Sequence, residues 1–145
     1  MNSPNLREDA IAAYCAASEA NDIDKLVQTL APDVELVSPL SGQLVIRGRD
    51  DLRVLLGAVY GTLRKLRWER ELHGDNKGLA IAHGYIGPFR VDDAMLFELA
   101  QDGRIRRIRP HLRPWLATTI FAARLALKIA PHPGLVWRAG RISQC

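Results

Sequence analysis

The second half of the chain constrains its fold most, because it consists of extended segments separated by short turns. Its four segments, LRWERELHG, GLAIAHGYIG, RVDDAMLFELAQ and RIRRIRPHL, lie within residues 66–112. The sequences GDNKG, GP and QDG, which connect them, are typical of hairpin turns. Strands joined by short turns pair with their neighbours, so this half is predicted to form a four-stranded antiparallel meander.

The first half predicts helices ahead of the meander. Apolar residues recur at helical spacing in two helices within residues 5–31 and in a third over residues 49–63. Between them, DVELVSPL (33–40) and GQLVIRG (42–48) are predicted to be short strands. This order predicts an α+β fold in which the helices pack on one face of a strongly bent sheet. We expect such a bent sheet to enclose a cavity.

Length and composition indicate one compact unit. A chain of 145 residues with 48% hydrophobic residues can bury a core of ordinary size. We expect residues 1–113 to form one domain and residues 114–145 to pack on it as a helical extension. The N-terminus has no apolar stretch, which predicts a cytoplasmic protein. Cys15 and Cys145 match no metal-ligand spacing, and we expect no metal and no cofactor.

The net charge of +4 is concentrated in the last third of the chain. The segment RIRRIRPHLR (104–113) holds five arginines, and no acid follows it. Its apolar alternation breaks between Ile105 and Ile108, which predicts a bulge there and turns most of the arginines outward. Without interleaved aromatic residues or a nucleic-acid-binding fold, this ridge does not predict a nucleic acid partner.

The segment PWLATTIFAARLALKIA (114–130) predicts a helix that is apolar on almost every side. It is short for a membrane span and contains Arg124 and Lys128, which argue against one. Three alternatives remain: a lid over the cavity, a dimerisation helix, or a basic amphipathic helix on a membrane surface. An apolar helix usually covers another apolar surface, which favours the lid and the dimer.

Three stretches of the chain carry a resemblance to a known family. They are YCAASEANDIDKLVQTLAPDVELVSPL (14–40), RGRDDLRVLL (47–56) and LFELAQDGRIRRIR (96–109). In order and spacing they resemble the nuclear transport factor 2-like superfamily, and within it the ketosteroid isomerases and the SnoaL-like polyketide cyclases. The resemblance covers residues 5–113 and implies an α+β barrel in which a cone-shaped, curved sheet of antiparallel and mixed strands wraps round the N-terminal helices.

The resemblance also implies where catalytic groups would lie. In the ketosteroid isomerases an Asp removes a proton next to a carbonyl, while a Tyr and a protonated Asp stabilise the resulting oxyanion. The resemblance places the Tyr at Tyr14, the base at Ser38 and the second Asp at Met95. A serine hydroxyl is too weak a base for a carbon-bound proton, and a thioether has no proton to donate. We therefore expect Ser38 to orient a ligand and the steroid-isomerase mechanism to be absent.

Strand alternation offers a different base. If Met95 faces the cavity, Asp93 and Phe97 face it as well. Asp93 is then a candidate base, provided that burial raises its pKa. The alternative is a solvated carboxylate at the end of a hairpin.

The strand LAIAHGYIG (79–87) leaves two orientations open. If its large side chains face the cavity, His83 is a candidate acid or base. If Ala80, Ala82 and Gly84 face it, the pocket is roomy and apolar and His83 lies on the other face. The candidate catalytic residues are Tyr14, Asp93 and His83, and the candidate ligand-binding residues are Ser38, Leu56, Trp68, Met95, Phe97, Ile108 and Leu112.

Taken together, these patterns predict a protein that binds an apolar small molecule. The preferred activity is that of a cofactor-free isomerase or cyclase acting on a carbonyl-bearing polycyclic or polyketide-like ligand. The alternative is a non-catalytic ligand-binding or interaction module on the same scaffold, with the basic C-terminal helix on a membrane as one form of it. Dimers are common among the relatives, so we expect a homodimer by analogy.

Overall fold

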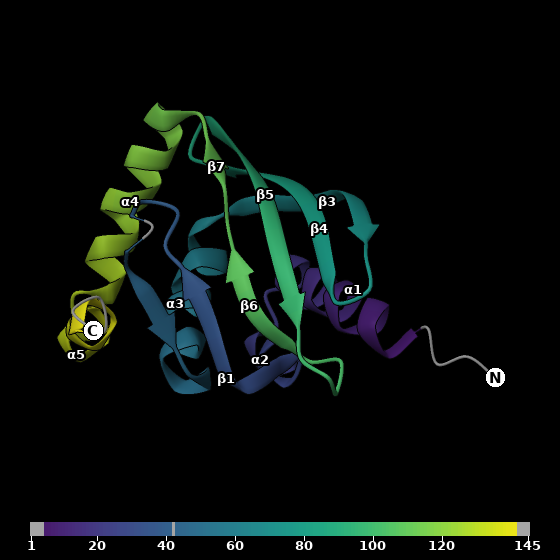
Figure 1. Cartoon of the computed structure of the whole chain (residues 1–145). Helices are drawn as coiled ribbons and strands as arrows, with labels where there is room; N and C mark the ends of the chain where they lie inside the picture. Colours follow the sequence, from purple (N-terminus) through teal and green to yellow (C-terminus); the bar gives the residue numbers. More distant parts are fainter. Residues whose placement is uncertain (1–4, 42, 142–145) are drawn as a thin grey trace.

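The computed structural model describes the backbone of residues 5–41 and 43–141, and side chains within residues 10–41, 43–69 and 71–139. Figure 1 shows helices and strands in the predicted order. They are α1 (Asn5–Glu19), α2 (Ile23–Gln28), β1 (Leu30–Val37), β2 (Val45–Arg47), α3 (Arg49–Thr62), β3 (Arg64–His73), β4 (Lys77–Ile86), β5 (Phe89–Leu99), β6 (Ile105–Arg109), β7 (Leu112–Arg113), α4 (Trp115–Ile129) and α5 (Pro133–Arg141).

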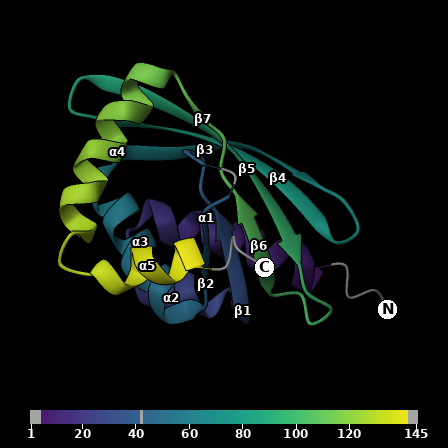
Figure 2. The same ribbon diagram turned by 60° about the vertical axis from the view of Figure 1, so that its left-hand side comes forward.

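The strands form one curved, mixed sheet. The strands follow the order β2-β1-β6-β5-β4-β3 across the sheet. The short strand β7 stands outside this order and pairs with β5. The pairs β3–β4, β4–β5 and β5–β6 are antiparallel, whereas β1 pairs parallel with β6. The sheet arches over α1, α2 and α3 and does not close on itself (Figures 1 and 2). This arrangement confirms the predicted α+β fold with a cone-shaped sheet.

Strand β1 differs from the predicted boundaries. It begins at Leu30 rather than at Asp33, because Leu30 already pairs with Ile105 of β6. It ends at Val37, so that Ser38 and Pro39 lie in the turn toward β2.

The bulge predicted in the last long strand is confirmed. Glu98 and Leu99 of β5 are opposite Arg107 and Ile105 of β6, so Arg106 is the extra residue. This insertion lets Ile105 and Ile108 both point into the core, where neither is exposed to solvent.

The arginine ridge predicted along β6 is only partly solvated, because Arg107 forms ion pairs. The Arg107 guanidinium lies 3.2 Å from Glu35 and 3.4 Å from Glu98, and Arg47 lies 3.0 Å from Glu35. Burial alone would raise the pKa of Glu35, but Arg47 and Arg107 lower it below its ordinary value.

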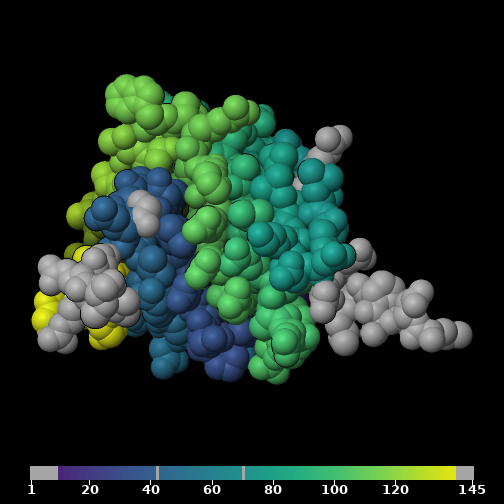
Figure 3. Space-filling view, viewed as in Figure 1, coloured from purple at the N-terminus to yellow at the C-terminus, as the bar shows by residue number. Residues whose placement is uncertain are grey.

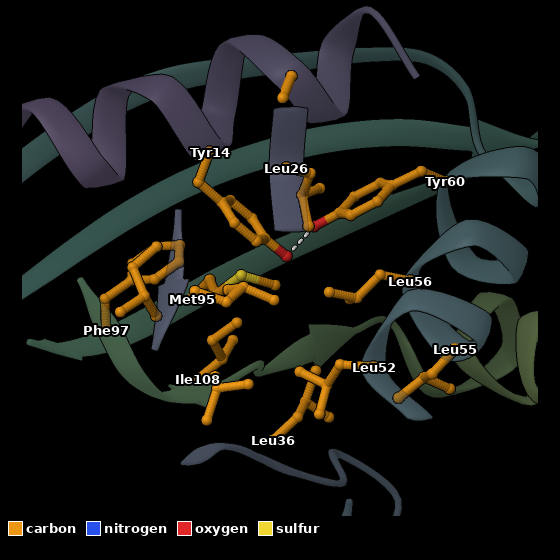
Figure 4. Packing of buried hydrophobic residues seen from close by; sticks show 14 of the residues in the cluster. Tyr14, Leu26, Leu36, Leu52, Leu55, Leu56, Tyr60, Met95, Phe97 and Ile108 are labelled. Atoms are coloured by element: carbon orange, nitrogen blue, oxygen red, sulfur yellow. Dashed lines mark hydrogen bonds between the residues drawn. The ribbon is translucent and has the colours of Figure 1, made fainter. Parts of the chain in front are cut away.

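The hydrophobic core fills the space between the concave face of the sheet and α1 to α3. Figure 4 shows α1 and α3 contributing Tyr14, Leu52 and Leu56, opposite Phe97 and Ile108 of the sheet. The apolar residues of α3 recur every three or four positions, which places one stripe of the helix against the sheet.

The two C-terminal helices cover the open side of the sheet. α4 packs against α3 and the strands β4, β5 and β7, and α5 packs against β2. In Figure 3 the surface of α4 lies at the upper left edge of the molecule, beside the chain that follows β1. None of the helices in the described ranges has both the length and the apolarity that crossing a membrane requires.

Candidate functional site

A pocket of about 930 Å³ lies between the sheet and helices α3, α4 and α5. Most of the side chains that line it are apolar. The exceptions are Ser38, Tyr60, His83 and Asp93, together with the indole groups of Trp68 and Trp137. Among the described lining residues, Asp93 is the only carboxylate, and neither Lys nor Arg is present. A pocket of this composition suits a neutral, apolar guest with a few polar atoms.

The orientation of β4 decides between the two alternatives left open by the sequence. Ala80, Ala82 and Gly84 are buried on the concave face, and Ala82 and Gly84 line the pocket. His83 contributes to the edge of the pocket, but its position in the strand belongs to the convex face. There its Nδ1 lies 2.6 Å from Oε1 of Glu69.

The strand register separates His83 from Asp93. Ala82 is opposite Asp93, and His83 is opposite Asp92, so the two candidate acid–base groups lie on opposite faces of the sheet. Asp92 faces Arg90 and Arg113 on the convex side, at 3.0 and 3.8 Å. The structure therefore brings Asp93, and not His83, to the concave face with Met95.

Asp93 has the environment of a group that exchanges protons near neutral pH. Its Oδ1 accepts a hydrogen bond from the backbone N–H of His111 at 3.1 Å. Burial raises the pKa of Asp93 to about 7, and the backbone N–H and the charge of His111 offset only part of this effect. The carboxyl group is thus divided between its neutral and ionised forms near pH 7.

Tyr14 forms a hydroxyl pair with a residue that the sequence analysis did not select. Its hydroxyl lies 2.6 Å from the hydroxyl of Tyr60, and the two groups point toward one another in Figure 4. Burial raises the pKa of both phenols, so both are neutral. Tyr60 lines the pocket, whereas Tyr14 lies behind it with no exposed surface. The spacing of Leu52, Leu56 and Tyr60 along α3 was the signal that could have identified Tyr60.

Ser38 lies in the pocket wall, in the turn that follows β1. Its backbone N–H donates to the carbonyl of Leu44 at 2.9 Å, and its hydroxyl oxygen accepts from the N–H of Leu40 at 3.2 Å. The hydroxyl retains its own proton for a further hydrogen bond.

The other candidate ligand-binding residues divide into two groups. Leu56, Trp68, Met95 and Leu112 line the pocket. Phe97 and Ile108 do not, because they lie deeper in the core and have no exposed surface. The ring of Phe97 is covered by Tyr14, with 5.2 Å between the ring centroids. The indole N–H of Trp68 donates to the hydroxyl of Ser18 at 2.8 Å, which fixes the ring in the wall.

The contribution of α5 to the pocket was not predicted from the sequence. Leu135, Val136, Trp137 and Ala139 line it, beside Phe121 and Leu125 of α4. A bidentate ion pair links α5 to α3: the Arg138 guanidinium donates to both carboxylate oxygens of Asp51, at 2.9 and 2.6 Å. The side chains described by the structure include no group of three or more His, Cys, Asp or Glu that could hold a metal ion.

The curved sheet, the enclosed helices and the pocket between them define the nuclear transport factor 2-like class of fold. The family model of the SnoaL-like domain matches residues 11–108. This chain belongs to the SnoaL-like domain family, as the resemblance in the sequence predicted.

Solved structures with the same fold support this assignment at low sequence identity. An uncharacterised protein from Silicibacter pomeroyi with a cystatin-like fold is 18% identical, with a TM-score of 0.85 over 93% of this chain and 96% of that chain. A steroid delta-isomerase from Pseudomonas aeruginosa is 16% identical, with a TM-score of 0.81 over 90% of this chain and 96% of that chain. A SnoaL-like protein of unknown function from Burkholderia thailandensis is 18% identical, with a TM-score of 0.64 over 79% and 100% of the two chains. No curated protein matches the sequence significantly.

Proposed function

We propose that the protein binds a neutral, apolar small molecule with a carbonyl group, of polycyclic or polyketide-like type, and moves a proton on it. The observation that supports this most is Asp93, the one carboxyl group among the described lining residues, with a pKa of about 7 in a mostly apolar pocket. A base with a pKa near the working pH combines a usable ionised fraction with enough basicity to accept a proton. No cofactor takes part in this proposal.

The proposed step is proton abstraction next to the carbonyl. The Asp93 carboxylate takes the proton, the electrons of the C–H bond form the enolate, and the resulting carboxylic acid returns the proton to carbon. Tyr60 is the proposed hydrogen-bond donor to the enolate oxygen, because it lines the pocket and its hydroxyl is neutral and paired with the neutral hydroxyl of Tyr14. In this proposal Ser38 orients the ligand, and Met95 contributes apolar surface.

A non-catalytic binding protein on the same scaffold is the second candidate. It is favoured by Ser38 and Met95, which occupy the positions that the resemblance assigns to catalytic carboxylates in the ketosteroid isomerases. In that case the protonated Asp93 donates a hydrogen bond to the carbonyl of a resident ligand, and no bond changes.

Deuterium exchange at carbon separates the two candidates. We would incubate the protein with 2-tetralone, an apolar bicyclic ketone, in D₂O and follow loss of the α-proton signals by NMR. The proposed activity predicts exchange that accelerates as the pH rises through about 7, because the ionised Asp93 is the base. Binding of the ketone without faster exchange would instead support the non-catalytic candidate.

Two variants and a second substrate sharpen the test. Asp93→Asn should lose the acceleration, and Asp92→Asn should retain it, because Asp92 lies on the opposite face of β5. A steroid enone should be isomerised far more slowly than by a steroid isomerase, because Ser38 and Met95 stand at the positions of its two catalytic carboxylates and Asp93 stands at neither. Isomerisation at the rate of a true isomerase would contradict the conclusion that Ser38 and Met95 do not replace the catalytic carboxylates.

A further inference from the structure

The exposed apolar side chains gather at the open side of the pocket. Eight large hydrophobic side chains are exposed in the described part of the chain, and six of them belong to the turn after β1, to α4 or to α5. They are Leu40, Trp115, Leu116, Leu127, Val136 and Trp137. Scattered exposed apolar residues are ordinary on a soluble protein, but a contiguous group marks a contact surface.

Three of these side chains form the rim of the pocket. Leu40, Val136 and Trp137 line the pocket and are also 57%, 51% and 62% exposed. Residues that line the pocket and are also exposed lie where the pocket meets the surface of the protein. The mouth of the pocket is therefore bordered by apolar groups from the turn after β1 and from α5.

The outer face of α4 extends this apolar border. Phe121, Leu125 and Ile129 lie on the inner face of the helix, against the pocket and the core. Trp115 and Leu127 are each 77% exposed, and the exposed positions between them are Leu116, Thr119, Ala123, Arg124 and Ala126. Arg124 is the one charged residue among these exposed positions. Figures 1 and 2 both show α4 along one edge of the molecule, with no element beyond it.

The helix α4 carries two cations and no acid. Arg124 and Lys128 are exposed on it, and the chain from residue 114 onward contains no Asp or Glu. Near the mouth of the pocket, the charge of Arg138 is paired with that of Asp51. The helix thus combines exposed Trp and Leu side chains with the positive charges of Arg124 and Lys128.

A second copy of the chain fits this surface poorly. Placing two α4 helices together would bring Arg124 and Lys128 of one copy close to the same cations of the other, with no carboxylate on either helix. A helix of this length is about 22 Å long and about 10 Å wide. That contact is well below the roughly 800 Å² that each partner contributes to a standard interface.

We propose that the rim of the pocket and the outer face of α4 dock on a membrane surface that contains anionic lipids. Trp115, Leu116 and Leu127 enter the boundary between headgroups and acyl chains, and Arg124 and Lys128 contact lipid phosphates. The mouth of the pocket then faces the membrane, where an apolar guest is most concentrated. The docking itself does not depend on the proposed chemistry at Asp93, so each proposal can fail alone.

Vesicle flotation tests the docking. The full-length protein is expected to float with vesicles of phosphatidylcholine and phosphatidylglycerol and to bind pure phosphatidylcholine more weakly, with the difference shrinking at high salt. Leu127→Gln should weaken binding about tenfold through lost apolar burial. Arg124→Gln and Lys128→Gln should each weaken binding to the anionic vesicles about fivefold.

Matched variants elsewhere on the surface serve as controls. Leu72 on β3 is 54% exposed and Arg104 follows the turn after β5, so Leu72→Gln and Arg104→Gln should leave flotation unchanged. Circular dichroism would establish that each variant is folded.

Three results would overturn the proposal. They are no flotation with either vesicle, equal binding to both vesicles, and binding that Leu127→Gln does not reduce. A concentration-dependent dimer in sedimentation velocity that Leu127→Gln dissociates, without vesicle binding, would assign the surface to a second copy of the chain.

Discussion

At the scale of single residues, the raised pKa of Asp93 has a consequence for stability. The folded state holds this proton up to about pH 7, whereas the unfolded chain releases it near its ordinary value of 3.8. Between these values the folded state binds more protons, so the free energy of unfolding falls as the pH rises and levels off above about 7. Burial of this carboxyl group therefore destabilises the fold at neutral and alkaline pH.

Asp93→Asn should remove that cost. In urea unfolding, the free energy of unfolding of the variant minus that of the natural protein should increase by roughly 3 kcal/mol from pH 4 to pH 8. Its side-chain oxygen can still accept the hydrogen bond from His111. Asp92→Asn should show no such gain, because Asp92 faces Arg90 and Arg113. A gap between Asp93→Asn and the natural protein that is independent of pH would mean that the carboxyl group is not desolvated.

The hydroxyl pair of Tyr14 and Tyr60 predicts unequal costs for two similar substitutions. Tyr60→Phe leaves the Tyr14 hydroxyl fully buried without its partner, and should cost about 2 kcal/mol of unfolding free energy. Tyr14→Phe should cost about 1 kcal/mol, because Tyr60 lines the pocket and we expect its hydroxyl to find another partner there. The double substitution should cost less than the sum of the two. Equal and additive costs in urea unfolding would contradict this assignment of the two environments.

At the scale of elements, β4 makes the pocket roomy by presenting small residues to it. Ala80 and Ala82 point to the same face, but Ala82 lines the pocket and Ala80 is enclosed in the core. We predict that Ala82→Leu fills part of the pocket, retains stability within about 1 kcal/mol and weakens binding of apolar probes. Ala80→Leu should instead overpack the core and lower the unfolding free energy by about 1–3 kcal/mol. If both variants lost the same stability in thermal unfolding, the assignment of Ala82 to the pocket and Ala80 to the core would be wrong.

The elements also show what a sequence can and cannot predict. Period-two alternation and turn sequences were sufficient for the meander, and the broken alternation between Ile105 and Ile108 was sufficient for the bulge. The face of β4 was not predictable, because both of its faces carry apolar residues. It is decided by α1, since Ile11 packs so closely over Gly78 that a side chain there would displace it.

The candidate site was likewise predictable only in part. Asp93 could be placed through its alternation with Met95, because both lie on one strand. The pairing of Tyr14 with Tyr60 joins residues on different helices, and the sequence carries no signal for their meeting. Residues 114–145 were expected to form a helical extension, but α5 as a separate helix in the pocket wall was not, because PHPGLVWRAGR contains two prolines and two glycines and its contacts with β2 and Asp51 are tertiary.

At the scale of the whole molecule, the pocket depends on the C-terminal helices as well as on the matched region. The matched SnoaL-like region provides most of the sheet and α3, and β7, α4 and α5 lie beyond residue 108 and complete the wall. The structure from Silicibacter pomeroyi covers 93% of this chain, more than residues 1–113 would account for, so part of this C-terminal wall has a counterpart there. The pocket is thus a property of the domain together with its C-terminal helices.

Native mass spectrometry of freshly purified protein tests the central claim, that this pocket holds an apolar guest, most directly. We predict that the natural protein carries a small additional mass that collisional activation releases, and that Ala82→Leu carries less of it. A natural protein that is free of any such mass, and that takes up no 2-tetralone when the ketone is added, would contradict the claim.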